Sequence, residues 1–138
     1  MNSLRLPFLL LALALVPACL TNFGPAPIEN VAWHLVELFG EKVAVPEGAE
    51  APSLRFDGAS QTVTGSTGVN RINGGYLLDG DALRFGALAT TRRAGPPELM
   101  ELETRFLQAL ERTQSARLDG ESLELREGDT VLARLEHP

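Results

Sequence analysis

The chain opens with an unbroken apolar run and later changes to short alternating stretches. Residues 6–16 are all apolar, and Arg5 stands just before them. From residue 31 onward, apolar and polar positions alternate over four to eight residues, which is typical of half-buried β-strands. Gly, Pro and Asp clusters separate these stretches, and residues 46–52 have the composition of a loop. The pattern predicts about eight strands, near residues 31–38, 53–56, 61–65, 76–78, 82–85, 116–118, 122–125 and 130–135.

Three Asp-Gly pairs stand between predicted strands and indicate tight hairpins. They are Asp57-Gly58, Asp79-Gly80 and Asp119-Gly120. Asp-Gly at the centre of a two-residue hairpin loop suits a turn in which both central residues have positive φ. The last two pairs share the pattern Leu-Asp-Gly-acid-x-Leu, which we interpret as the same turn chemistry used twice and not as an internal repeat.

One segment has helical periodicity. Pro96-Pro97 marks its start, where a missing N–H costs nothing. Acidic residues crowd its first turns and arginines follow, which complements the helix dipole. An apolar stripe runs along it, and such stripes usually face a core, although a partner can also use them. The stripe contains Leu99, Met100, Leu102, Phe106, Leu107 and Leu110, and the acids are Glu98, Glu101 and Glu103.

These elements predict an α+β fold that is mostly antiparallel β. About eight strands form a bent or partly closed barrel, with one helix inserted before the last three strands. A single amphipathic helix can cover the apolar face that such a sheet leaves open.

The apolar start is interpreted as a signal peptide over residues 1–18. A charged beginning, a short apolar middle and small residues before the cut are its usual parts. Cys19, the only cysteine of the chain, follows directly and is the expected site of lipidation. Residues 19–30 then form a tether, and residues 31–138 form the folded domain. The alternative is ordinary cleavage after Ala18, which leaves a soluble secreted or periplasmic protein with a free thiol.

Charge and composition narrow the range of partners and cofactors that the chain is expected to bind. The net charge is −6, which disfavours nucleic acid because its phosphates need clustered basic residues. With Cys19 committed to lipid, the folded part has no thiol for a disulfide or a cysteine-based metal site. His34 and His137 are the two histidines, too few for a His-rich site. We expect a monomer without metal or cofactor.

Two stretches carry a family resemblance. Gly68-Val69-Asn70-Arg71 leads to Gly75-Tyr76, and Thr90-Thr91-Arg92-Arg93-Ala94-Gly95 precedes the helix. Together with Trp33-His34-Leu35 near the domain start, this order of motifs resembles the META domain (HslJ-like) family from about residue 33 to residue 135. The resemblance implies a role in the cell envelope or in stress response, with no known mechanism.

This chain departs from the family pattern at two positions. Val69 and Gly95 stand where the family has its two loop cysteines, and the resemblance implies that these cysteines form a disulfide in other members. Both are replaced together here. We therefore predict that the two loops still lie side by side, with Val69 supplying apolar packing in place of the cross-link.

The polar residues of these loops are the candidate site: Asn70, Arg71, Thr91 and Arg92. Asn tolerates unusual backbone conformations and bonds local backbone, while Arg offers a planar fork of donors for carbonyls or carboxylates. The favoured interpretation is that they brace the two loops against the start of the helix. The alternative is an anion- or peptide-binding patch at one end of the barrel. A cluster that only braces loops is expected to be satisfied internally and to leave no open pocket.

The sequence contains no nucleophile elbow, phosphate loop or cysteine nucleophile within the fold, so no enzyme is expected. The function predicted is a non-enzymatic lipoprotein of the cell envelope, anchored to a membrane by lipid, with an envelope protein or lipid as partner. Because Leu20 follows Cys19, the periplasmic side of an outer membrane is favoured. The alternative function is a lipid- or peptide-binding carrier, or a pilot module, that uses the interior of a half-open barrel.

Overall fold

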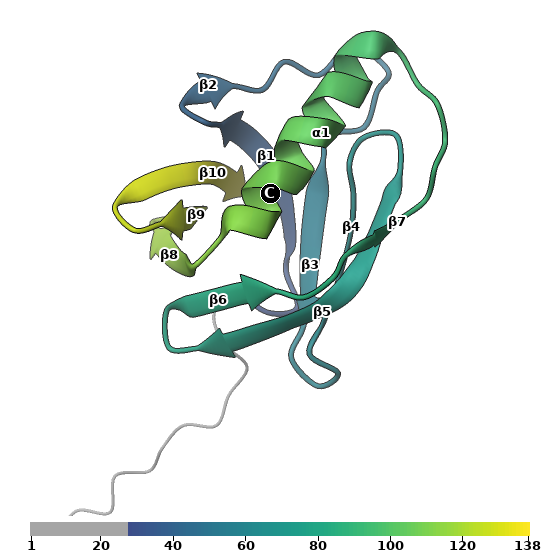
Figure 1. The fold of residues 1–138 in the computed structure, drawn as a ribbon. Helices are drawn as coiled ribbons and strands as arrows, with labels where there is room; N and C mark the ends of the chain where they lie inside the picture. The colour runs from purple at the N-terminus through teal and green to yellow at the C-terminus, as the bar shows by residue number, and fades with distance from the viewer. Residues whose placement is uncertain (1–27) are drawn as a thin grey trace, which may run out of the picture.

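A computed structural model describes residues 28–138 as one helix and ten strands (Figure 1). The predicted signal peptide, Cys19 and most of the predicted tether lie outside the described residues. The helix is α1 (Pro97–Arg112). The strands are β1 (Ala32–Leu38), β2 (Glu41–Lys42), β3 (Ser53–Asp57), β4 (Thr62–Ser66), β5 (Arg71–Asp79), β6 (Ala82–Phe85), β7 (Ala89–Thr90), β8 (Ser115–Asp119), β9 (Ser122–Glu127) and β10 (Thr130–Glu136).

Eight of these strands close into a ring. The order is β1-β3-β4-β5-β6-β8-β9-β10, and β10 pairs with β1 to complete it. All pairings between named strands are antiparallel, and the short strands β2 and β7 are added to β1 and β5. The closure is uneven, because β6 and β8 share a single residue pair, Ala82 with Ser115. The predicted fold class is therefore confirmed, as an irregular ring and not a regular barrel.

Three hairpins use a glycine followed by an acid as their two-residue loop. They are Gly80-Asp81, Gly120-Glu121 and Gly128-Asp129, and each glycine has a φ of 56–62°. The prediction that Asp-Gly occupies the centre is wrong by one residue, since only the glycine needs positive φ when it comes first in the loop.

At Asp57 the predicted tight turn is wrong, because β3 and β4 are joined by the longer loop 58–61. The Asp57 carboxylate accepts the N–H groups of Ala59 and Ser60, at 3.0 and 3.4 Å. The side chain thus imitates a turn of backbone, as Asp often does. The positive φ of this loop falls at Gln61, at 53°.

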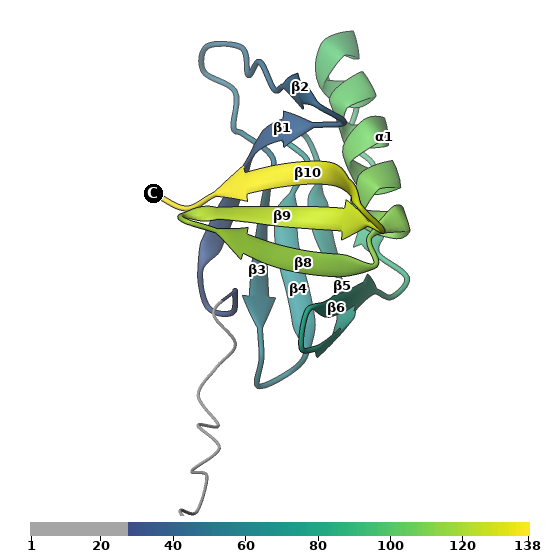
Figure 2. The same ribbon diagram turned by 90° about the vertical axis from the view of Figure 1, so that its left-hand side faces the viewer.

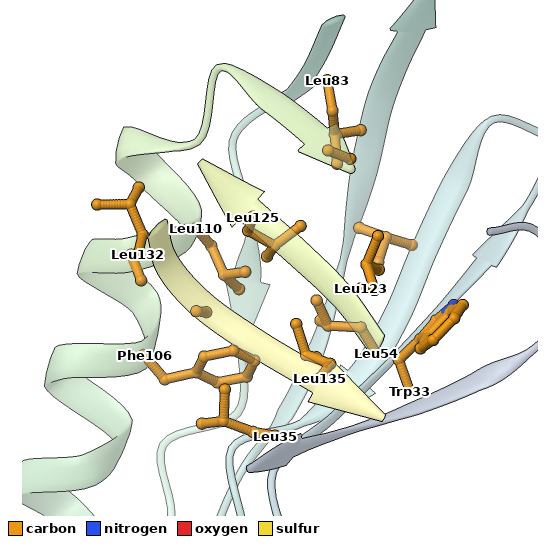
Figure 3. Packing of buried hydrophobic residues seen from close by; sticks show 14 of the residues in the cluster. Trp33, Leu35, Leu54, Leu83, Phe106, Leu110, Leu123, Leu125, Leu132 and Leu135 are labelled. Atoms are coloured by element: carbon orange, nitrogen blue, oxygen red, sulfur yellow. The ribbon is translucent and has the colours of Figure 1, made fainter. Parts of the chain in front are cut away.

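The helix lies across one opening of the ring (Figure 2). It begins at Pro97, as predicted, and buries Leu99, Phe106, Ala109 and Leu110. Figure 3 shows the Phe106 ring beside Leu35 and Leu135, inside the ring of strands. These side chains are at most 2 % exposed. Phe106 and Leu110 of the apolar stripe are therefore part of the core, Leu102 and Leu107 pack against it, and the interior is filled by side chains.

Residues 28–30, assigned to the tether in the sequence analysis, pack onto the domain. Ile28 belongs to the core, and its carbonyl accepts the Trp33 indole N–H at 2.9 Å. The Asn30 N–H donates to the Phe56 carbonyl at 2.8 Å. The Tyr76 hydroxyl donates to the Glu29 carboxylate at 2.6 Å. Burial and then this hydrogen bond raise the pKa of Tyr76 far above its ordinary value.

Candidate functional site

The first candidate loop is a tight turn between β4 and β5. The Thr67 hydroxyl accepts the Asn70 N–H at 2.9 Å, and the Thr67 N–H donates to the Asn70 carbonyl at 2.7 Å. Gly68 between them has a φ of 96°, a conformation that a side chain would strain. Thr67 and Asn70 are both buried. The turn therefore fixes the direction in which Asn70 leaves the backbone.

The Asn70 side chain joins this turn to the loop before α1. Its carbonyl oxygen accepts the Arg93 N–H at 2.7 Å and the Thr91 hydroxyl at 3.0 Å. Its amide nitrogen donates to the Arg93 carbonyl at 3.1 Å and to the Glu103 carboxylate at 2.8 Å. An Asn amide offers two donors and two acceptor positions. All four are used, and Asn70 is only 2 % exposed.

Glu103 brings the helix into the same network. One oxygen of its carboxylate accepts hydrogen bonds from the Thr67 hydroxyl and from the Asn70 amide. Four polar side chains, those of Thr67, Asn70, Thr91 and Glu103, thus hold turn 67–70, loop 91–96 and α1 together. The residues predicted as the candidate site included neither Thr67 nor Glu103. The motif match that includes Gly68–Arg71 was the one available signal that this turn is special.

The other predicted site residues are Arg71, Thr91 and Arg92. Arg71 and Thr91 are joined by hydrogen bonds that involve their backbones, and Arg71 and Arg92 are exposed to solvent. The Arg71 N–H donates to the Thr91 hydroxyl at 3.0 Å, and the Thr91 N–H donates to the Arg71 carbonyl at 3.2 Å. The Arg71 and Arg92 residues are exposed. Within residues 28–138 neither guanidinium has an ion pair or hydrogen bond. The structure therefore brings Asn70 and Thr91 together as braces and leaves the two guanidinium groups outside the network.

A hollow of about 450 Å³ adjoins the braced loops. Its lining comes from residues 48–50, 68–71 and 93–96, with Ser66 and Leu99. Asn70 and Thr91 are thus satisfied internally, as the bracing interpretation requires, whereas among the described residues the Arg71 and Arg92 guanidinium groups are not, and an open surface hollow lies beside the loops. Whether these loops bind a ligand stays a prediction.

The two positions of the implied family disulfide are in contact. A Cβ atom placed on Gly95 would lie 2.8 Å from a γ-methyl carbon of Val69 and 3.5 Å from the Val69 Cβ. The prediction that the two loops lie side by side is confirmed. The Val69 methyl groups occupy the space that a side chain at residue 95 would need, so packing takes the place of the cross-link.

Replacing Gly95 by Ala is expected to lower the free energy of unfolding by about 1–3 kcal/mol, the usual cost of overpacking. The new methyl group would overlap with Val69. Adding Val69→Ala should recover part of the loss, because it removes the overlapping methyl groups. Urea denaturation of the two single variants and the double variant measures the coupling. Strictly additive effects would contradict the contact.

The sequence predicts neither a metal site nor a catalytic site, and the histidines and acidic residues are the groups that bear on this prediction. Within residues 28–138, no three His, Cys, Asp or Glu side chains are grouped so as to hold a metal ion. His34 is half-buried on β1, opposite Ser53 and Glu136 in the neighbouring strands. The His137 ring meets the Trp33 ring edge-on, with centroids 5.2 Å apart. No helix of the described residues has the length and apolar character needed to cross a bilayer.

The closed antiparallel ring, the covering helix and the two braced loops define a small α+β domain. The chain belongs to the META domain family, whose model matches residues 26–138. No curated protein matches it.

Two solved structures resemble the fold. A protein from Burkholderia xenovorans, solved by NMR, has a TM-score of 0.63 and 24% identity, over 80% of this chain and 83% of that one. A DUF4847 family protein from Bacteroides vulgatus ATCC 8482 has a TM-score of 0.62 and 19% identity, over 81% and 95%. At these identities, the likeness shows the fold alone.

Proposed function

We propose that the chain is an exported lipoprotein whose META domain is not an enzyme and acts through its outer surface in the cell envelope. The observation that carries the proposal is the position of Cys19, directly after an apolar leader and nine residues before Ile28. Nine extended residues reach about 30 Å. An acylated Cys19 would therefore hold the domain close to the membrane, and we favour the periplasmic side of an outer membrane.

The filled interior supports action through the surface. Trp33, Phe106 and Leu123 are among the side chains that occupy the ring, each at most 2 % exposed. A carrier needs an enclosed apolar pocket of several hundred Å³. The proposal that the domain is not an enzyme rests on the sequence, which lacks the nucleophile and phosphate-binding motifs named above. A role in stress response is supported only by the family resemblance.

The carrier or pilot function is the second candidate, and one observation favours it. An open, mainly apolar hollow of about 300 Å³ lies where the described chain begins. Its lining includes Ile28, Leu78, Ala116 and Leu118. This volume is at the lower limit of ligand pockets, and the hollow is open at the surface. The function through the surface is therefore preferred.

Mass spectrometry of the chain purified from its native host tests the anchor. We expect the mature N-terminus at Cys19 with acyl chains on it, because two or more acyl chains are needed for stable anchoring. Cys19→Ser should move the protein from the membrane fraction to the soluble fraction. An unmodified Cys19, or an N-terminus at Leu20, would contradict the anchor and leave the soluble secreted protein as the better interpretation.

A further inference from the structure

Arginines on one face of the ring have no acidic partner. Four arginines elsewhere in the described residues are ion-paired, among them Arg105 with Glu41 at 3.1 Å and Arg112 with Glu127 at 2.8 Å. Glu124 on β9 likewise lies between two arginines of β9 and β10. Arg55 on β3 and Arg71 on β5 are both exposed, and within residues 28–138 neither guanidinium has an ion pair or hydrogen bond. In a chain of net charge −6, these two cations create a local positive surface.

Strand register places the two arginines within one polar face. Figure 1 shows β3, β4 and β5 side by side in the ring. Side chains alternate between the two faces of a strand, and the apolar residues of this part of the sheet, Leu54, Phe56, Val63 and Ile72, are buried. Two rows of polar residues therefore point outward. They are Ser53-Ser66-Arg71 and Arg55-Thr64-Asn73.

These six residues line a hollow of about 530 Å³ on the outside of the ring. Arg55 and Arg71 are separated by one strand and by two residues along the strands, so their backbones lie about 12 Å apart on the sheet. Two long side chains at that spacing can hold a ring-sized ligand from both sides. Thr64 and Ser66 are on β4, the strand between them, and Ser53 lines the same hollow from β3.

The chemistry of the face selects a class of ligand. β3, β4 and β5 are inner strands with partners on both edges, so an extended peptide cannot be added as a further strand. The lining contains no aromatic residue, although aromatic anchors dominate protein interfaces. Guanidinium, hydroxyl and amide groups together suit a ligand rich in both hydroxyl groups and negative charge.

We infer that this outer groove binds an acidic saccharide, a sugar chain that carries carboxylate or phosphate groups. The 450 Å³ hollow beside the braced loops shares Glu50, Ser66 and Arg71 with the groove. The two hollows are therefore adjacent, and a chain of several sugars could extend from β3 toward Arg93. This inference rests on the proposed action through the surface, but not on the lipid anchor.

Glu50 allows a test in which a substitution is expected to strengthen ligand binding, whereas the arginine substitutions are expected to weaken it. It is the one acid among the residues that line the groove, and it is exposed. Its carboxylate repels an anionic ligand, so Glu50→Gln is expected to strengthen binding several-fold. Arg55→Gln and Arg71→Gln should each weaken binding about tenfold, the range for one hydrogen bond to a charged group.

The experiment uses the full chain, purified in non-ionic detergent, and isothermal titration calorimetry. The probes are an oligogalacturonate, a phosphorylated mannan oligosaccharide and a neutral mannan oligosaccharide of the same length. Arg84→Gln is the matched control, since Arg84 is an exposed arginine on β6 outside the groove. We expect at least one acidic probe to bind more tightly than the neutral one, and the better probe identifies carboxylate or phosphate. Arg84→Gln should leave that affinity unchanged.

Three results would overturn the inference. They are equal affinity for the acidic and neutral probes, an equal loss in Arg84→Gln, and equal or tighter binding of a poly-glutamate peptide. The last result would assign the face to acidic protein. Thermal unfolding of each variant serves as a check, and these exposed substitutions should leave the midpoint in place. Acylation of Cys19 is measured separately, so failure of the anchor and failure of this groove are distinguishable.

Discussion

Replacing Asn70 by Ala is expected to lower the free energy of unfolding by about 3–5 kcal/mol, since four hydrogen bonds are lost at a buried position. One of them joins the Asn70 amide to the charged Glu103 at 2.8 Å, and another holds the Arg93 N–H at 2.7 Å. The loss leaves buried polar groups without partners, which costs more than the bonds themselves contribute. Denaturation by urea, followed by circular dichroism, measures the change.

Asn70→Asp is the sharper control because it conserves shape. The amide nitrogen that donates to Glu103 becomes an oxygen, so two carboxylates face each other at about the same distance. Their repulsion raises the pKa of the shared carboxyl pair in the folded state above the unfolded value near 4. A raised folded pKa gives stability that is present at low pH and lost as pH rises through that pKa. The deficit relative to the unmodified chain should therefore shrink from pH 7 toward pH 4.

Adding Glu103→Gln to Asn70→Asp reverses the direction of this hydrogen bond, because the amide introduced at residue 103 can donate to the carboxylate introduced at residue 70. This double variant should recover part of the stability at pH 7, although the Arg93 carbonyl, which accepts from the Asn70 amide, stays unpaired. If Asn70→Asp matched the unmodified chain at pH 7, the hydrogen bond between Asn70 and Glu103 would not contribute to stability.

The sequence predicted the elements well because alternation and helical periodicity are local signals. The strand around Leu54 and Phe56 and the helix from Pro97 are where the pattern placed them. The role of Glu103 was not predictable in this way, because its partner Thr67 is 36 residues away. A local pattern reports a charge near a helix start and says nothing of what that charge contacts across the fold.

The candidate site likewise has one part that the sequence predicted and one part that depends on the fold. Asn70 and Thr91 were predicted together through the family resemblance, and the structure joins them by a hydrogen bond of 3.0 Å. The placement of Arg55 and Arg71 in neighbouring rows of one face, on either side of β4, depends on strand register. A register is fixed only when buried faces of several strands are matched. The outer groove therefore appears only in the folded chain.

Introducing cysteines at residues 69 and 95 is expected to create a disulfide that raises the free energy of unfolding by about 3 kcal/mol. The chain-entropy model gives roughly this value for a closed loop of about 25 residues. The Cβ positions lie 3.5 Å apart, within the range that disulfides adopt (about 3.5–4.5 Å). In a domain of this size, the unfolding midpoint should rise by roughly 10 °C.

Comparison of the oxidised and reduced forms of the same variant isolates the cross-link. Val69→Cys/Gly95→Cys is made in a Cys19→Ser background, so that the two new thiols are the only ones. The reduced form should be less stable than the unmodified chain, since the side chain at residue 95 enters space next to residue 69. Differential scanning calorimetry with and without dithiothreitol measures both forms. Thiols that stay free under oxidising conditions would show that residues 69 and 95 do not come close enough to form a disulfide. A disulfide that formed and raised the midpoint would show that the two loops keep the spacing that a cross-link between residues 69 and 95 requires.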